Sequence, residues 1–277
     1  MVGSTTPHEV LIVQENAGQA VPDSLATEEP LEIRLATGEE IRPVAVTMRT
    51  PGHDEELAVG FLYGEGIIER RGDVVGMSRP LDRTGRPEEN ILVVEMARGL
   101  EPDLRTLDRH FFTSSACGVC GKAGIEALLL KKEPMPRRGP RVPPEVLYTL
   151  PDSLQSRQSV FKSTGGLHAA GLYRADGTQL AVREDVGRHN ALDKLVGTSL
   201  DAERLPLDEC VVMISGRASY EILQKCLMAD VTFVCAVSAP SSLAVSLARQ
   251  FDITLIGFLR DRRLNIYHGG ERVLPES

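Results

Sequence analysis

The feature that most constrains the fold is an alternation of strand-like and helix-like segments near the end of the chain. Short apolar runs at residues 210–215, 232–237 and 253–258 have the composition of buried strands. Between them, residues 219–228 and 241–249 carry apolar side chains at helical spacing. This order is typical of a parallel sheet with helices on its faces. We therefore expect an α/β fold, with a mixed or parallel sheet and flanking helices.

The first part of the chain has a different hydrophobic pattern, which predicts a smaller, β-rich lobe. Residues 31–35 and 41–48 read as a hairpin, and residues 74–77 and 91–96 as further strands. A helix is expected from Asp54, whose acidic first turn suits the helix dipole, and another over residues 144–156, extending to 161. We expect a loose tail at residues 1–7 and a polar loop at 16–30. The rest, 8–277, is expected to be one domain with a β-rich lobe (about 8–112) and an α/β lobe (113–277).

Composition narrows the class of protein. The chain has 277 residues, is 42% hydrophobic and carries a formal net charge of −8. This balance argues against a general nucleic-acid surface or binding to an anionic membrane. No run has the length of a membrane-spanning helix, and the five cysteines do not have the spacing of a secreted disulfide framework. We expect a cytoplasmic protein with reduced thiols and with neither nucleic acid nor membrane as a partner.

A pair of closely spaced thiols is the strongest chemical signal. Cys117 and Cys120 form a C-x-x-C motif among small residues, followed by Lys122 and an apolar helical run. A helix N-terminus and a nearby lysine favour the thiolate, which is the reactive form. A structural zinc site would need a second pair, and the other cysteines stand alone in the sequence. The spacing favours reactive sulfur chemistry over structural zinc, with no metal expected.

The strand ends supply a second signal. In a parallel sheet, ligands bind beyond the carboxyl ends of the strands, where helix N-termini meet. Residues 215–219, 238–242 and 257–263 fall at three such ends and combine hydroxyl groups with arginines. Taken singly, such serines are usually helix caps and such arginines solvated, but together with the turn at 185–190 they lead us to expect a phosphate-bearing or other anionic ligand. The candidates from this geometry are Arg217, Ser238 and His189.

Several familiar motifs are absent or incomplete. The Gly118–Lys122 stretch lacks the first glycine of a P-loop, and Ala123 replaces its Ser or Thr. His53-x-Glu55 together with the C-x-x-C pair is similar to the zinc deaminase motif, but Ala116 stands where that motif has proline. We interpret His168, on a strand of small residues, as a core histidine, and a proton shuttle near the thiols is the alternative.

The combination of motifs resembles one family. Residues 115–121 (SACGVCG), 50–61 (TPGHDEELAVGF) and 185–194 (DVGRHNALDK), with the S-G-R at 215–217 and the S-A-P at 238–240, are similar to the FdhD family. These are formate dehydrogenase accessory sulfurtransferases of the FdhD/NarQ type. The resemblance runs from about residue 30 to the C-terminus.

The resemblance implies a function. Members accept sulfur from a cysteine desulfurase as a cysteine persulfide and deliver it to the molybdenum cofactor, in its bis-molybdopterin guanine dinucleotide form, for the formate dehydrogenase apoenzyme. It assigns the persulfide to Cys117 and makes Cys120 an assistant in transfer or in release of sulfur by disulfide formation. It also implies a homodimer and a fold similar to that of cytidine deaminases. The positions it implies for the guanine nucleotide ends of the cofactor are Phe258, Leu259, Arg260, Asp261, Arg262 and Arg263.

Two other functions stay open from the residues. In one, the protein is a non-catalytic carrier or chaperone of the molybdenum cofactor, and the cysteines only hold their loop. In the other, the C-x-x-C pair is the dithiol of an oxidoreductase, although its position does not match a thioredoxin-like unit.

Overall fold

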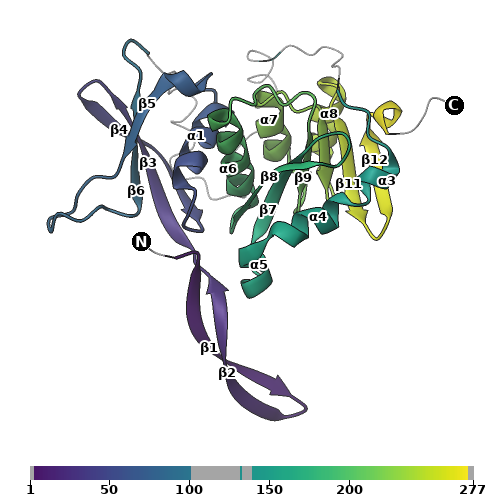
Figure 1. Ribbon diagram of the computed structural model, residues 1–277, viewed down its shortest axis with the longest axis horizontal. Helices are drawn as coiled ribbons and strands as arrows, with labels where there is room; N and C mark the ends of the chain where they lie inside the picture. The colour runs from purple at the N-terminus through teal and green to yellow at the C-terminus, as the bar shows by residue number, and fades with distance from the viewer. Residues whose placement is uncertain (1–2, 101–131, 133–138, 274–277) are drawn as a thin grey trace.

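The computed structural model describes residues 3–100, 132 and 139–273, and these form two lobes with one projecting hairpin (Figure 1). The amino-terminal lobe has a four-stranded sheet of order β4-β3-β6-β5, and the carboxyl-terminal lobe a six-stranded sheet of order β12-β11-β10-β9-β7-β8. The strands are β1 (Thr5–Gln14), β2 (Ala17–Ala26), β3 (Glu29–Thr37), β4 (Glu40–Arg49), β5 (Val74–Ser78), β6 (Ile91–Met96), β7 (His168–Tyr173), β8 (Gln179–Asp185), β9 (Val211–Ile214), β10 (Phe233–Ala236), β11 (Thr254–Arg260) and β12 (Arg263–His268). The α-helices are α1 (Asp54–Gly64), α3 (Pro144–Leu147), α4 (Leu150–Arg157), α5 (Ser159–Thr164), α6 (Arg188–Asp201), α7 (Tyr220–Met228) and α8 (Ser242–Gln250).

The projecting hairpin corrects two predictions. β1 begins at Thr5, so residues 5–7 belong to a strand and not to a loose tail, and most of the predicted polar loop is β2. The two strands meet at Glu15 and Asn16, which both have positive φ (47° and 70°). Such a two-residue turn matches the twist of an antiparallel pair. The prediction failed because β2 is rich in alanine and polar residues and shows no clear alternation.

The amino-terminal lobe confirms the predicted hairpin and helix. β3 pairs antiparallel with β4 and parallel with β6. Alternate residues of β3 (Leu31, Ile33 and Leu35) are buried, and they form one core with Leu57 and Leu62 of α1. Burial of one face of β3 follows from the period of two in its sequence.

The two lobes are joined where helices α1 and α6 cross. A Cβ atom on Gly60 of α1 would lie 1.8 Å from the carbonyl oxygen of Asp193, and one on Gly197 of α6 would lie 2.0 Å from that of Glu56. Only glycine permits such an approach of two helix backbones. Leu200 of α6 also packs into the core of the amino-terminal lobe. Helix α6 therefore belongs to both lobes.

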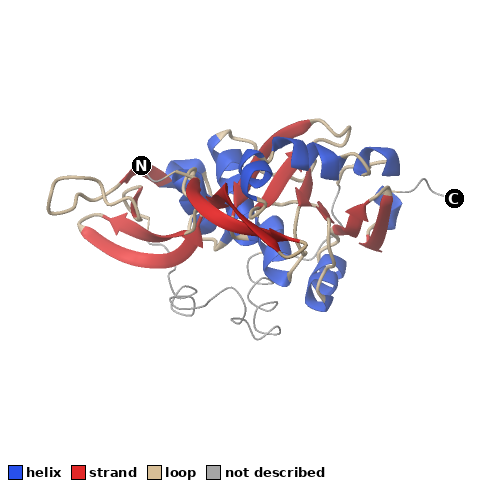
Figure 2. Cartoon of the chain, turned by 90° about the horizontal axis from the view of Figure 1, so that it is seen from below, coloured by secondary structure: helices blue, strands red, loops and turns tan. Residues whose placement is uncertain are grey.

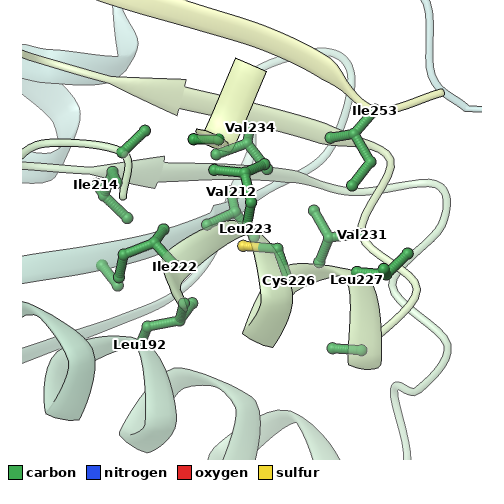
Figure 3. Packing of buried hydrophobic residues seen from close by; sticks show 14 of the residues in the cluster. Leu192, Val212, Ile214, Ile222, Leu223, Cys226, Leu227, Val231, Val234 and Ile253 are labelled. Carbon is green, nitrogen blue, oxygen red and sulfur yellow. The ribbon is translucent and has the colours of Figure 1, made fainter. Parts of the chain in front are cut away.

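The carboxyl-terminal sheet contains the predicted parallel unit. β9, β10 and β11 are parallel and are connected by α7 and α8, whereas β7, β8 and β12 make the sheet mixed. Val212 and Ile214 face α6, α7 and α8, where Cys226 and Leu223 pack (Figure 3). The alternate residues of β9 face α3 and α4. Figure 2 shows helices on both faces of the strands.

The helix predicted over residues 144–156 is divided into three short helices. α3 ends at Leu147, α4 begins at Leu150, and α5 follows at Ser159. Pro151 lies in the first turn of α4, where its missing N–H is not needed for a hydrogen bond within the helix. In the middle of a continuous helix the same residue would remove a hydrogen bond, so the helix is interrupted before it. Gly165, with a φ of 67°, ends α5.

Candidate functional site

The carboxyl ends of the parallel strands meet at one edge of the six-stranded sheet, as the strand–helix pattern predicts. The turn after β9 bridges the turn after β10, because the Ser241 N–H donates to the Ala218 carbonyl at 2.9 Å. The Phe258 N–H of β11 donates to the Ser238 carbonyl at 3.2 Å. β8 ends at the same edge, since it runs antiparallel to β7, and β7 runs antiparallel to β9.

A buried carboxylate fixes the turn that follows β8. Asp185 is fully buried, and its Oδ1 accepts hydrogen bonds from the Gly187 N–H at 2.9 Å and from the Asn190 Nδ2 at 3.0 Å. Its Oδ2 lies 2.7 Å from the Lys194 Nζ and accepts from the Thr50 N–H at 3.2 Å. The network connects the start of α6 to the end of β4, and it fixes the conformation of the turn between β8 and α6.

That turn presents a cluster of basic side chains. The Nε atom of Arg188 is buried and has no hydrogen-bond partner among the described residues. Burial lowers the pKa of Arg188, and the positive charge of Arg217 lowers it further. Burial likewise lowers the pKa of His168, with Arg188 and His189 as the next causes. A buried donor that has no acceptor and lies next to other positive charges destabilises the protein, unless a bound anion supplies the acceptor and the opposite charge.

His189 is anchored at one side of this cluster. Its Nε2 lies 2.9 Å from the Glu221 Oε2 and 3.3 Å from the Ser219 Oγ. The hydrogen bond with His189 is the main cause of the lowered pKa of Glu221. His189 therefore already has a carboxylate partner, whereas Arg188 has no hydrogen bond at its Nε among the residues that the structure describes.

The segment carried over from the family resemblance forms the tip of the β11–β12 hairpin. Phe258 is half-buried and Leu259 is buried, while Arg260, Asp261, Arg262 and Arg263 are exposed. Asp261 and Arg262 have φ of 52° and 55° and make the two-residue turn closed by Arg260 and Arg263. The Arg262 guanidinium lies 5.1 Å from the centre of the Tyr148 ring. This contact is a cation–π interaction that holds the side chain at the rim.

The predicted residues therefore fall into two basic groups along one edge. His189 and Arg217 follow the ends of β8 and β9, and the hairpin tip extends from β11, which lies two strands from β9, or about 10 Å across the sheet. Ser238, at the end of β10, lies between them. The sequence did not single out His168 or Glu221 as parts of this site, because their relevance depends on which turns become neighbours.

The reactive cysteines of the prediction, Cys117 and Cys120, lie outside the described residues. The three other cysteines are free thiols. Burial raises the pKa of Cys226 to about 12 and also raises the pKa of Cys210 and of Cys235. These three thiols are protonated at neutral pH and poorly suited to nucleophilic chemistry.

Two further properties of the described residues concern metal ions and membranes. No group of three or more His, Cys, Asp or Glu side chains in ranges 3–100 and 139–273 is placed to hold a metal ion. None of the helices in those ranges is long and apolar enough to cross a membrane.

Fold and site together define an α/β protein with a mixed sheet and a cationic edge at the carboxyl ends of its strands. The chain belongs to the FdhD/NarQ family, which it matches over residues 26–274, and the resemblance seen in its motifs is thereby confirmed.

Named relatives agree with this assignment. The chain is 50% identical to the sulfur carrier protein FdhD of Mycolicibacterium paratuberculosis (strain ATCC BAA-968 / K-10), over 93% of this chain and 95% of that protein. It is 47% identical to that of Streptomyces coelicolor (strain ATCC BAA-471 / A3(2) / M145), over 97% and 95% respectively. The crystal structure of a putative formate dehydrogenase accessory protein from Desulfotalea psychrophila has the same fold, with a TM-score of 0.72 and 21% identity over 98% of this chain and 99% of that one. The likeness to cytidine deaminases stays a prediction.

Proposed function

We propose that this protein is a sulfurtransferase that carries sulfur as a persulfide on Cys117. The sulfur comes from a cysteine desulfurase and goes to the molybdenum cofactor, in its bis-molybdopterin guanine dinucleotide form, before a formate dehydrogenase apoenzyme receives that cofactor. Relatives up to 50% identical are named sulfur carrier proteins, and their likeness covers nearly the whole chain, which supports the sulfur-carrying part of this proposal.

The chemistry can be written with balanced bonds. The Cys117 thiolate attacks the outer sulfur of the donor's persulfide, a new S–S bond forms, and the donor cysteine leaves as a thiolate. Attack of the Cys120 thiolate on the Cys117 Sγ then releases the outer sulfur as hydrosulfide and leaves a Cys117–Cys120 disulfide. The cysteines lose the two electrons that the sulfur gains, and an external thiol restores the pair.

The observation that carries the substrate assignment is the basic edge of the sheet. Arg188 has a buried Nε without a partner among the described residues and stands close enough to Arg217 for the two charges to repel. Arginine binds phosphate through charge-assisted hydrogen bonds, and a diphosphate would supply both acceptors and negative charge. The second basic group, at the hairpin tip of residues 258–263, lies on the same edge. Two such groups suit a substrate that has a phosphate-bearing nucleotide at each end.

The first experiment is intact mass spectrometry after incubation with a cysteine desulfurase and cysteine, without reductant. The wild type should gain a sulfur-mass adduct that a thiol reductant removes. Cys117→Ala should gain none, while Cys120→Ala should gain the adduct and keep it longer. Cys210→Ala is the matched control and should behave as the wild type.

The outcomes separate the competing functions. An adduct that is unchanged in Cys117→Ala would refute the assignment of the carrier cysteine. No adduct on any variant, with guanine nucleotide binding intact, would favour the non-catalytic carrier. If the wild type reduces disulfides in a separate assay, and Cys117→Ala and Cys120→Ala lose that activity equally, the dithiol oxidoreductase is favoured.

A further inference from the structure

His168 is a half-buried histidine at the cationic edge of the six-stranded sheet. It is the first residue of β7 and lies on the strand face that packs against α6, as Ala170 and Leu172 do at alternate positions. Neither ring nitrogen makes a hydrogen bond within the part of the chain that the structure describes. The ring of His189, by contrast, is paired with Glu221 at 2.9 Å. His168 is therefore the imidazole of this cluster that is available to a ligand.

Two hydrogen bonds fix the position of His168 next to the turn after β9. The Ala169 N–H donates to the Ser215 Oγ at 2.8 Å, and the Ser215 N–H donates to the Ala169 carbonyl at 2.9 Å. A Cβ atom on Gly216 would lie 3.4 Å from the His168 Nδ1 and 3.5 Å from the Arg188 Cδ. The imidazole and the arginine side chain therefore border the same space beside Gly216, which has no side chain of its own to fill it.

The charges around this space are mostly positive. Burial is the main cause that lowers the pKa of His168 below its usual 6.5, and Arg188 and His189 of α6 lower it further. Asp185 of β8 acts in the opposite direction, but both of its oxygens are already bonded around the β8–α6 turn. Arg217, in the turn after β9, adds a positive charge near Arg188. His168 is therefore mostly neutral at pH 7 in the free protein.

We propose that His168 binds the diphosphate of the substrate's nucleotide and takes up a proton from solvent as it does so. The inference rests on the proposed function, because it concerns the same cationic edge. A diphosphate beside Arg188 brings negative charges next to the imidazole and so reverses the effect of the neighbouring cations. An imidazolium can donate from both ring nitrogens, and its hydrogen bonds to phosphate oxygens are charge-assisted. The proton leaves again when the diphosphate dissociates.

Proton uptake makes binding depend on pH with a defined sign. The pKa of His168 lies below 6.5 in the free protein and is raised in the complex, so between these two values the complex holds a proton that the free protein lacks. In this window the affinity increases as the pH falls, by at most about tenfold per pH unit. Above the pKa of the complex the ring is neutral in both states, and this contribution to the pH dependence disappears.

The test measures binding of guanosine diphosphate by isothermal titration calorimetry from about pH 6 to 8.5, in pairs of buffers with different ionisation enthalpies. The two buffers together give the number of protons taken up. The terminal phosphate of the nucleotide also titrates near neutral pH, so each value is compared with that of His168→Gln, which keeps a polar side chain but cannot gain a proton.

His268→Gln is the matched control. His268 is also half-buried, and it lies at the opposite edge of the sheet, because it pairs with Leu255 near the start of β11. Its Nε2 lies 3.3 Å from the Asp252 Oδ1, away from the cationic edge. This variant should take up as many protons as the wild type when it binds the nucleotide.

The wild type should take up more protons than His168→Gln, by up to about one for each nucleotide bound. The dissociation constant of His168→Gln should exceed that of the wild type by about tenfold at pH 6 and should equal it at about pH 8.5. In NMR spectra of the wild type, the His168 ring should titrate at a higher pH in the nucleotide complex than in the free protein. This second measurement decides the question even if His168→Gln loses stability.

Two results would overturn the inference and leave the substrate assignment intact. One is nucleotide binding with equal proton uptake by the wild type and His168→Gln. The other is a His168 ring that titrates at the same pH with and without the nucleotide. A wild type that does not bind guanosine diphosphate would overturn the substrate assignment itself, and this inference with it.

Discussion

At the scale of single residues, Arg188 shows how the site differs from the rest of the molecule. Two buried cations among the described residues have carboxylate partners: the Arg49 Nε donates to Asp54 at 2.9 Å, and the Lys225 Nζ lies 2.8 Å from Asp193. Arg188 instead has a buried Nε without an acceptor among the described residues, next to another cation. Such an arrangement lowers stability in the free protein and favours binding of an anion.

This contrast predicts opposite effects of one substitution on binding and on stability. Arg188→Gln should weaken the binding of guanosine diphosphate by about tenfold or more, which corresponds to about 1.4 kcal/mol. The same change should leave the thermal midpoint unchanged or raise it, because it removes a charge for which the cost of burial and the repulsion from Arg217 outweigh the attraction of Glu221. Isothermal titration calorimetry and thermal unfolding measure the two effects.

Arg174→Gln is the matched control, since this exposed arginine lies in the β7–β8 turn at the opposite edge of the sheet. It should bind the nucleotide as the wild type does. If Arg188→Gln also binds normally, the nucleotide does not use this turn. If it binds normally and Arg262→Gln does not, the hairpin tip alone would be the nucleotide site.

The sequence could identify only part of this site. Arg217, Ser238 and His189 follow strand ends, and parallel strand ends must share an edge, so their proximity could be predicted. The lack of an acceptor for the Arg188 Nε could not be predicted. It follows from the pairing of Glu221 with His189, and not with Arg188, in the folded structure. The positive φ of Phe258, 53°, was equally hidden, since that conformation is rare for an aromatic residue.

At the scale of elements, the crossing of α1 and α6 is the most constrained contact. Gly60→Ala would place a methyl group 1.8 Å from the Asp193 carbonyl oxygen, which is backbone and cannot rotate away. The helices would have to separate, and we expect a loss of about 3 kcal/mol in the free energy of unfolding. Urea unfolding followed by circular dichroism measures the loss.

Gly64→Ala in the same helix is the control. Its new Cβ would meet the Lys225 Cγ at 3.4 Å, which is an ordinary van der Waals distance. This variant should be as stable as the wild type or slightly more so, because alanine favours the helix by up to about 1 kcal/mol. Equal stability of the two variants would show that the helices can move apart at no cost.

The same elements show why the fold was predictable in some places and not in others. The segments β9 to β11 are buried on both faces, so their runs of Val, Ile, Met and Cys were unambiguous. The predicted loop that became β2 is stabilised by its pairing with β1, and β12 by its pairing with β11, neither of which a local pattern reveals. The division of the predicted helix at 144–161 depended on Pro151.

At the scale of the whole molecule, an ion pair between the lobes predicts how stability depends on pH. Glu56 of α1 accepts hydrogen bonds from both the Nε and the Nη2 of Arg183 in β8, the latter at 2.7 Å. Burial alone would raise the pKa of Glu56, but the hydrogen bonds from Arg183 and His53 lower it from 4.5 to about 2. The stabilisation is therefore complete above pH 4.5 and is lost as the pH falls to about 2.

Glu56→Gln should unfold more easily than the wild type at pH 7, by at most about 3 kcal/mol. The difference in unfolding free energy between the two proteins should shrink as the pH falls from 4.5 towards 2. Urea denaturation at a series of pH values measures this difference. A gap that stays constant with pH would mean that the charge of Glu56 contributes nothing.

The sharing of α6 between the lobes has a consequence for synthesis on the ribosome. Helix α1 ends at Gly64, and its partner α6 begins only at Arg188, so the two are made far apart in time. At a synthesis rate of about 5–20 residues per second, roughly 6–25 s pass between the end of α1 and the start of α6. During that interval the amino-terminal lobe exposes the apolar surface that α6 will cover. We therefore expect a ribosome-associated chaperone to bind the nascent chain at this stage. A fragment truncated before α6 should aggregate for the same reason.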